Sequence, residues 1–189
     1  MKDISENAKL NRAQKCFIDA LLSLMEEKSY HDITVQELSE TAQYDRRTYY
    51  RYFSCKENIL RLYCAHILDE MALLMSEKGP LSLYSGVLAY FSFWEKYTEF
   101  LRLLGRNDLL HFMAAQHDEL LYEYVGKSVQ PDIPKDLESA QPLSRYSFYF
   151  TSGGLWNTLV HWVNEEPDRT PEELTDCVVK TFLMISQLA

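Results

Sequence analysis

Apolar residues recur at helical spacing along most of the chain, and no convincing alternating strand pattern occurs in it. The first apolar stripe runs from about Ala8 to Lys28, with charged residues on the other faces. The same spacing predicts a long helix up to about Lys78 and further helices at about 81–104, 106–127, 142–164 and 171–188. A loop with two prolines is expected from Ser128 to Gln141. The pattern therefore predicts an all-α fold.

Three segments carry the capping box that marks a helix N-terminus, a Ser or Thr followed three residues later by Glu. The pairs are Thr34 with Glu37, Ser54 with Glu57, and Thr170 with Glu173. Pro171 also suits the first position of the last helix. These signals predict where three helices begin.

Two short helical patterns lie between Thr34 and Glu57, separated by Gln43 and Tyr44. The first is amphipathic, and Asp45 can cap the second. The second helix carries Arg46, Arg47, Thr48, Tyr50, Arg51 and Tyr52. Guanidinium, hydroxyl and phenol groups reach base edges and phosphate oxygens in a major groove. The segment therefore predicts a helix-turn-helix.

The same segment resembles the TetR (TetR/AcrR) family of regulators. Residues 48–53, TYYRYF, followed by Lys56 and Glu57, are similar to the family signature of Thr, a hydrophobic residue, Tyr, Arg or His, Tyr or His, and Phe, then Lys-Glu. The preceding ITVQELSETA resembles its stabilising helix, and the likeness runs from about residue 11 to 66. The family's turn usually holds Gly-Val, so Gln43 must avoid a positive φ or accept its cost. Asp45 stands where Ser, Thr or Asn is usual.

The resemblance implies a homodimeric transcription regulator, most often a repressor that a small molecule releases from DNA. We expect a helix-turn-helix domain at residues 1–55, a connecting helix at 56–78 and an effector-binding and dimerisation domain at 79–189, with Gly79-Pro80 at the boundary. The two recognition helices would enter successive major grooves of a pseudo-palindromic operator. The homodimer would form through the last two helices, where Gly153 and Gly154 allow close approach of another backbone. This Tyr/Phe-rich segment with Gly and Trp resembles one branch of the family.

Candidate DNA contacts follow from the helix-turn-helix. The base-edge candidates are Arg46, Arg47, Thr48 and Arg51. Tyr50, Tyr52 and Lys56 would position phosphates, with Thr34 and Gln36 adding to them. Lys56 lies at a helix N-terminus, where amide groups and the helix dipole favour an anion. Tyr49 and Phe53 should instead face inward as core.

Composition changes this picture little. The net charge is −9, but within residues 42–62 the five Lys and Arg side chains meet only Asp45 and Glu57, so the basic patch is local. No apolar run reaches the roughly 18 residues of a membrane span, and the N-terminus has no signal-peptide core. We expect a cytoplasmic protein without membrane contact.

The four cysteines lack metal or disulfide spacing. Cys55 beside a helix N-terminus could act as a redox sensor, but an ordinary reduced thiol is the default.

Aromatic residues are dense beyond residue 80, which suits either a helical core or a pocket for an apolar or aromatic effector. For any single residue the core interpretation is favoured; the candidates for an effector pocket are Phe91, Trp94, Tyr122, Tyr149 and Trp156. The histidines lack the spacing of metal pairs, and no nucleophile or phosphate-loop motif is present. We therefore expect no enzyme, metal or cofactor. The alternative function is a coactivator or adaptor of the same fold that acts through a protein partner.

Overall fold

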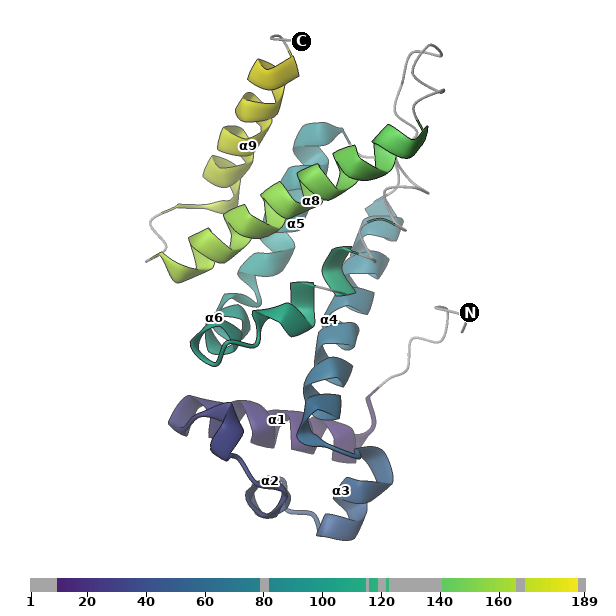
Figure 1. Cartoon of the computed structure of the whole chain (residues 1–189), viewed down its shortest axis with the longest axis vertical. Helices are drawn as coiled ribbons and strands as arrows, with labels where there is room; N and C mark the ends of the chain where they lie inside the picture. The colour runs from purple at the N-terminus through teal and green to yellow at the C-terminus, as the bar shows by residue number, and fades with distance from the viewer. Residues whose placement is uncertain are drawn as a thin grey trace. The chain divides into compact units, whose positions relative to one another are not determined.

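The computed structural model describes residues 10–78, 82–114, 116–118, 122, 141–165 and 169–186, and all regular elements in these ranges are helical (Figure 1). The all-α prediction is confirmed. Gly79-Pro80, most of the predicted loop from Ser128 to Gln141, and most of residues 119–127 lie outside the described residues. None of the helices in the described ranges is long and apolar enough to cross a membrane.

The helices follow one another in an order close to the predicted one. They are α1 (Arg12–Glu27), the short 3₁₀ helix η1 (Tyr30–Asp32), α2 (Val35–Thr41), α3 (Arg46–Tyr52), α4 (Lys56–Lys78), α5 (Leu83–Glu95), α6 (Thr98–Arg106), α8 (Gln141–Asn164) and α9 (Pro171–Ser186). Residues 110–114 and 116–118 are also helical.

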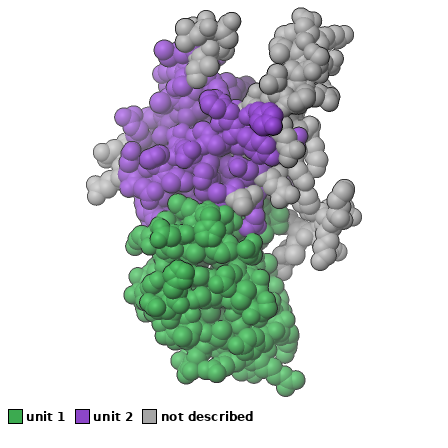
Figure 2. Space-filling view, viewed as in Figure 1, with its two compact units in different colours: residues 1–69, 103–113 green, residues 70–102, 114–189 purple. Residues whose placement is uncertain are grey.

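The chain divides into two compact units, coloured separately in Figure 2. The first contains residues 1–69 and 103–113, and the second contains residues 70–102 and 114–189. Both α4 and α6 contribute residues to each unit. The predicted domain boundaries at residues 55 and 78 stay a prediction.

Phe17 of α1 lies at the centre of the first unit, where α1, α2 and α3 pack on one another. Its ring centre is 5.6 Å from that of Tyr49, 5.7 Å from that of Tyr44 and 5.8 Å from that of Phe53. These contacts join α1 to the turn, to the middle of α3 and to its C-terminal cap. The inner face of α3 therefore packs on the aromatic core, and its outer face is exposed to solvent.

The turn between α2 and α3 requires a left-handed residue. Gln43 has a φ of 57°, and its N–H donates to the Glu40 carbonyl at 3.1 Å. Tyr44 N–H donates to the Ser39 carbonyl at 3.0 Å, which closes the turn. A side chain with a Cβ costs about 1–2 kcal/mol in this conformation. Gln43 therefore accepts the cost of a positive φ.

The second unit has a core of large rings from α5 and α8, and α5 packs along α9. The Phe91 ring lies 6.2 Å from that of Trp162, and the Trp162 indole N–H donates to the Arg169 carbonyl at 3.0 Å. Arg102 Nε donates to the Val163 carbonyl at 2.7 Å. These contacts hold the C-terminal end of α8 against the start of α6 and the link to α9.

Two predicted helix boundaries were wrong. The single helix expected at 81–104 is divided into α5 and α6 by a turn at Lys96 and Tyr97, whose N–H groups donate to the Phe93 and Trp94 carbonyls. The helix expected to start at Arg106 instead begins at residue 110, after a turn in which Asp108 has a φ of 58°. Lys96 and Tyr97 carry no turn signal, whereas Gly105, Asn107 and Asp108 are residue types that favour the second turn.

Candidate nucleic-acid interface

The start of the predicted recognition helix α3 is fixed by its cap. Asp45 Oδ1 accepts a hydrogen bond of 2.6 Å from the Thr48 N–H. Hydrogen bonds from the Thr48 hydroxyl and N–H, with the nearby Arg47 and Arg51, hold the pKa of the Asp45 carboxyl below its ordinary value. Asp45 is therefore ionised at neutral pH and stabilises the positive end of the helix dipole.

Tyr49 anchors α3 to the core, and its neighbours point outward. Tyr49 is 0% exposed and Phe53 is 3% exposed, so the prediction that both face inward is confirmed. Burial raises the pKa of Tyr49 to about 12, and its buried hydroxyl has no hydrogen-bond partner among the described residues. Tyr50 is 61% exposed and Tyr52 is 37% exposed.

The three arginines of α3 are all exposed, and Thr48 is half-buried. Arg46 Nη2 donates to Gln36 Oε1 at 2.6 Å, and Gln36 Nε2 donates to Glu40 Oε1 at 2.8 Å. The side chains of Arg46 and Gln36 are therefore held together across the turn. Arg51 lies over the Tyr52 ring, with its guanidinium carbon 6.0 Å from the ring centre. The result is a solvent-facing cluster of cationic and phenolic donors on two helical turns.

Thr34 is occupied as a helix cap. Its hydroxyl accepts from Glu37 N–H at 3.2 Å and donates to Glu37 Oε2 at 2.8 Å, which confirms the first capping box. Glu37 also forms an ion pair with Lys28. The hydrogen bonds from Lys28 and Thr34 lower the pKa of Glu37 to about 2.

Lys56, at the start of α4, points into the protein. Its Nζ donates to the carbonyls of Tyr30, His31 and Ile33, at 2.6 Å, 3.0 Å and 3.1 Å. The same atom is 4.5 Å from the centre of the Tyr30 ring. In this structure the ammonium is bound by the turn before α2.

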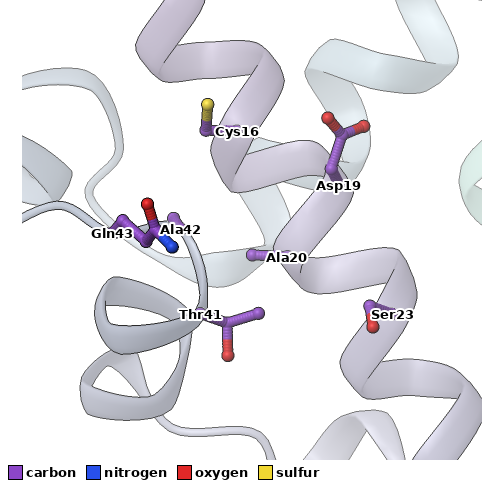
Figure 3. Close-up of a pocket in the computed structure, with 7 residues that line it drawn as sticks. All are labelled: Cys16, Asp19, Ala20, Ser23, Thr41, Ala42 and Gln43. Atoms are coloured by element: carbon purple, nitrogen blue, oxygen red, sulfur yellow. The ribbon is translucent and has the colours of Figure 1, made fainter.

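A shallow cavity of about 330 Å³ lies between α1 and the turn that follows α2 (Figure 3). Its walls come from α1 and from the end of α2: Cys16, Asp19, Ala20, Ser23, Thr41, Ala42 and Gln43. The lining contains one carboxylate and no cation, so it is unsuited to phosphate. It also lacks the aromatic rings expected for the effector pocket.

The five aromatic candidates for an effector site lie in the second unit and differ in burial. Phe91 and Trp94 are 0% exposed, whereas Tyr122 is 42% and Tyr149 is 41% exposed. Trp94 and Trp156 are in edge contact with ring centres 6.3 Å apart, and Tyr122 stacks on Tyr149 at 6.4 Å. Tyr149 and Trp156 are about two turns, roughly 10 Å, apart on α8. The two pairs thus lie along one face of that helix.

Beside Trp94 and Trp156 lies a buried histidine that the sequence did not single out. His117 is 0% exposed, and its Nε2 is 2.9 Å from the Tyr90 hydroxyl. Burial lowers the pKa of His117 to about 4, although Asp118 favours the protonated form. At neutral pH the ring is therefore neutral: Nδ1–H donates to Asp118 Oδ1 at 3.4 Å, and Nε2 accepts from Tyr90. The Trp94 indole N–H beside it has no hydrogen-bond partner among the described residues.

His117 is not part of a possible metal site among the described residues. Within the described parts of the chain, no group of three or more His, Cys, Asp or Glu side chains could hold a metal ion. The chemistry that the described residues offer is concentrated on α3.

A short cationic helix, capped by Asp45 and held by a packed core of α1, α2 and α3, defines a helix-turn-helix DNA-binding protein. Residues 17–62 match the model for "Bacterial regulatory proteins, tetR family". This part of the chain is therefore a DNA-binding domain of the tetR type. A search of curated proteins by sequence gave no match.

Solved structures of similar fold include three regulators. A TetR transcriptional regulator from Streptococcus agalactiae 2603V has a TM-score of 0.62 and 19% identity, over 94% of each chain. The dihydroxyacetone kinase operon activator DhaS has a TM-score of 0.58 and 21% identity, over 93% of this chain and 97% of its own. The TetR family repressor AlkX from Dietzia sp. strain DQ12-45-1b, implicated in biodegradation of n-alkanes, has a TM-score of 0.53 and 14% identity, over 93% and 96%. At these identities the likeness concerns the fold.

Proposed function

We propose that the protein binds a pseudo-palindromic operator as a homodimer through α3, represses transcription there, and leaves the operator when a small molecule binds the second unit. The observation that carries the DNA-binding part is the division of α3 into a buried anchor, Tyr49, and an exposed row of donors. Arginine reads guanine edges through two parallel hydrogen bonds, and tyrosine hydroxyls donate to phosphates.

The proposed DNA contacts follow the exposure of each side chain. Arg46, Arg47, Arg51 and Thr48 would face base edges, while Tyr50 and Tyr52 would face phosphates. Gln36 and Thr34 would act from α2, Gln36 through its hydrogen bond to Arg46. Lys56 is left out of this set because its ammonium already donates to three carbonyls.

The DNA-binding proposal is tested with duplexes from upstream of the protein's own gene and of neighbouring genes. Fluorescence anisotropy of the full chain is expected to show specific binding that weakens with salt. Arg47→Ala and Arg51→Ala should each cost about 1–3 kcal/mol per half-site. Lys96→Ala, which removes an exposed cation between α5 and α6, is the matched control and should bind normally. Full binding by a variant with Arg46, Arg47 and Arg51 all changed to Ala would refute the assignment.

The homodimer is proposed to form through α8 and α9, because both expose large apolar side chains. On α8, Tyr146 is 72% and Phe150 is 71% exposed; on α9, Leu183 is 52% and Met184 is 66% exposed. Gly153 and Gly154 continue the exposed side of α8, and a Cβ on either would meet no atom within 4 Å. Such a surface allows a second copy to approach closely.

The dimer is tested by Phe150→Glu, which places a charge in the proposed interface. Light scattering should show a monomer, and operator affinity should fall because one protomer reads only a half-site. Leu73→Glu is the matched control, since Leu73 of α4 is a 46% exposed apolar residue outside α8 and α9. A dimeric Phe150→Glu protein would contradict the proposed interface.

An apolar or aromatic effector is proposed to bind along the face of α8 between Tyr149 and Trp156, beside Phe91 and Trp94. Aromatic walls with a few polar groups suit such a ligand, and Tyr122 stacks at the exposed end. The test is a screen of aromatic metabolites for release of labelled operator. Trp156→Ala should lose the response of the wild-type protein and keep operator affinity. A response that survives Trp156→Ala would place the effector elsewhere.

One observation favours the alternative of a coactivator that works through a protein partner: the fold is similar to that of DhaS, an operon activator. A reporter gene behind the upstream DNA separates the two functions. Repression predicts lower expression when the protein is present. Activation that requires a co-purifying second protein, with no operator binding by the protein alone, would favour the coactivator.

A further inference from the structure

Lys56 has a set of partners that a phosphate-binding lysine would not need. An ammonium group has three N–H donors and no acceptor. Lys56 directs its donors at three backbone carbonyls, those of Tyr30, His31 and Ile33, within 2.6–3.1 Å. The Tyr30 ring lies beside the same atom at 4.5 Å, and a cation is attracted to the face of an aromatic ring. The donors of the side chain are therefore fully used within the protein.

The three carbonyls belong to the turn that leads into α2. Ile33 directly precedes Thr34, whose side chain caps α2. The same turn is held from another side, because the Tyr30 N–H donates to Asn107 Oδ1 at 2.8 Å within the same unit. Lys56 and Asn107 together fix the backbone from which α2 starts.

Lys56 is also the first residue of α4, a short distance along the chain from the end of α3. Phe53 ends α3 in the core, and only Ser54 and Cys55 separate it from Lys56. The Lys56 side chain thus links the turn before α2 to the start of α4, the helix that follows α3. Movement of α4 would be passed to α2 through Lys56 and to α3 through the chain.

We propose that Lys56 is a positioning residue for DNA recognition, which holds α2, and α3 with it, against the start of α4. This inference rests on the proposed DNA-binding function. A phosphate contact would require the ammonium to leave at least one carbonyl of a half-buried turn without a donor, which is unfavourable. Lys56 therefore acts on the operator through the geometry of the two helices.

Two variants separate positioning from phosphate binding. Lys56→Arg keeps the charge, but a planar guanidinium does not converge on three carbonyls as an ammonium does. Lys56→Met keeps most of the stem and removes the charge. Circular dichroism establishes the fraction folded at the assay temperature. Anisotropy with the operator duplex and a scrambled duplex between 50 and 200 mM salt then gives affinity, specificity and the salt slope.

The positioning role predicts that both folded variants lose at least about tenfold in operator affinity. The slope of log K against log salt should stay that of the wild-type protein, because no phosphate contact is removed. Wild-type affinity for Lys56→Arg, together with a slope lower by about 1.8 per dimer for Lys56→Met, would overturn the proposal in favour of a phosphate contact.

A third variant keeps the test decisive if both Lys56 variants fold poorly. Asn107→Ala loosens the same turn and leaves every cation in place. It should lower operator affinity and leave the salt slope unchanged. Wild-type operator affinity for Asn107→Ala would overturn the idea that this turn positions α2. Failure of the wild-type protein to bind any upstream duplex would instead refute the proposed function, whatever the Lys56 variants do.

Discussion

Acid should destabilise the second unit through His117. The buried imidazole has a pKa of about 4 in the folded protein, against about 6.5 in an unfolded chain. Between these values the unfolded chain binds a proton that the folded protein does not bind. The free energy of unfolding should therefore fall as the pH is lowered from 6.5 to 4. At 1.36 kcal/mol for each pH unit, this one group accounts for about 3 kcal/mol.

The assay uses the location of the tryptophans. The chain has three, Trp94, Trp156 and Trp162, and all lie in the second unit. Their fluorescence therefore follows the unfolding of that unit in urea at pH 7, 6, 5 and 4. Carbon-detected or proton NMR of the histidine ring gives the pKa of His117 directly.

His117→Gln supplies the comparison, because glutamine does not titrate. In that variant the pH dependence between 6.5 and 4 should be smaller by about 3 kcal/mol. His31→Gln is the matched control: His31 is an exposed histidine of the first unit, and its replacement should leave the unfolding of the second unit as in the wild-type protein. A native His117 pKa near 6.5, or equal pH dependence in wild type and His117→Gln, would refute the reasoning.

Three further predictions concern the first unit. Gln43→Gly should stabilise it in urea unfolding by about 0.5–1 kcal/mol, because relief of the strained φ outweighs the added freedom of the unfolded chain; a loss of stability would show that Gln43 is unstrained. Tyr49→Phe removes a buried hydroxyl without a partner and should raise stability by about 1 kcal/mol in the same measurement; lower stability would reveal a partner. Glu37 stabilises the fold above pH 4.5, and this contribution is lost as the pH falls towards 2, so acid titration followed by circular dichroism should be flatter for Glu37→Gln in that range.

Local signals predicted the helix-turn-helix well. Thr34 and Asp45 cap α2 and α3 as expected, because a cap needs only a short side chain and the next few N–H groups. The inward direction of Tyr49 and the exposure of Tyr50 follow from helical periodicity. For such features the necessary information lies within about four residues.

Features that depend on distant parts of the chain were not predictable in this way. The sequence paired Ser54 with Glu57, whereas the structure gives the Ser54 hydroxyl to Asn58 Oδ1 at 2.6 Å. The place of Lys56 at a helix start predicts a phosphate contact, which stays a prediction; its three carbonyl partners lie more than 20 residues away in sequence and could not be predicted from spacing. Helical periodicity shows on which face of a helix a side chain lies. It does not show which distant segment of the chain that side chain contacts.

The same limit applies to the second unit. His117 looked ordinary because its partners Tyr90 and Trp156 come from other segments. The five aromatic residues proposed for the effector site could be selected by type, but their division into buried and half-exposed pairs depends on how the helices pack.

The cap of α3 has a consequence for how a duplex can be approached. Asp45 is ionised and accepts a hydrogen bond from the Thr48 N–H at the amino end of the helix. A backbone phosphate arriving at that end would meet a carboxylate, and like charges repel. We therefore expect the phosphates to contact α3 along its side, and not at its amino end.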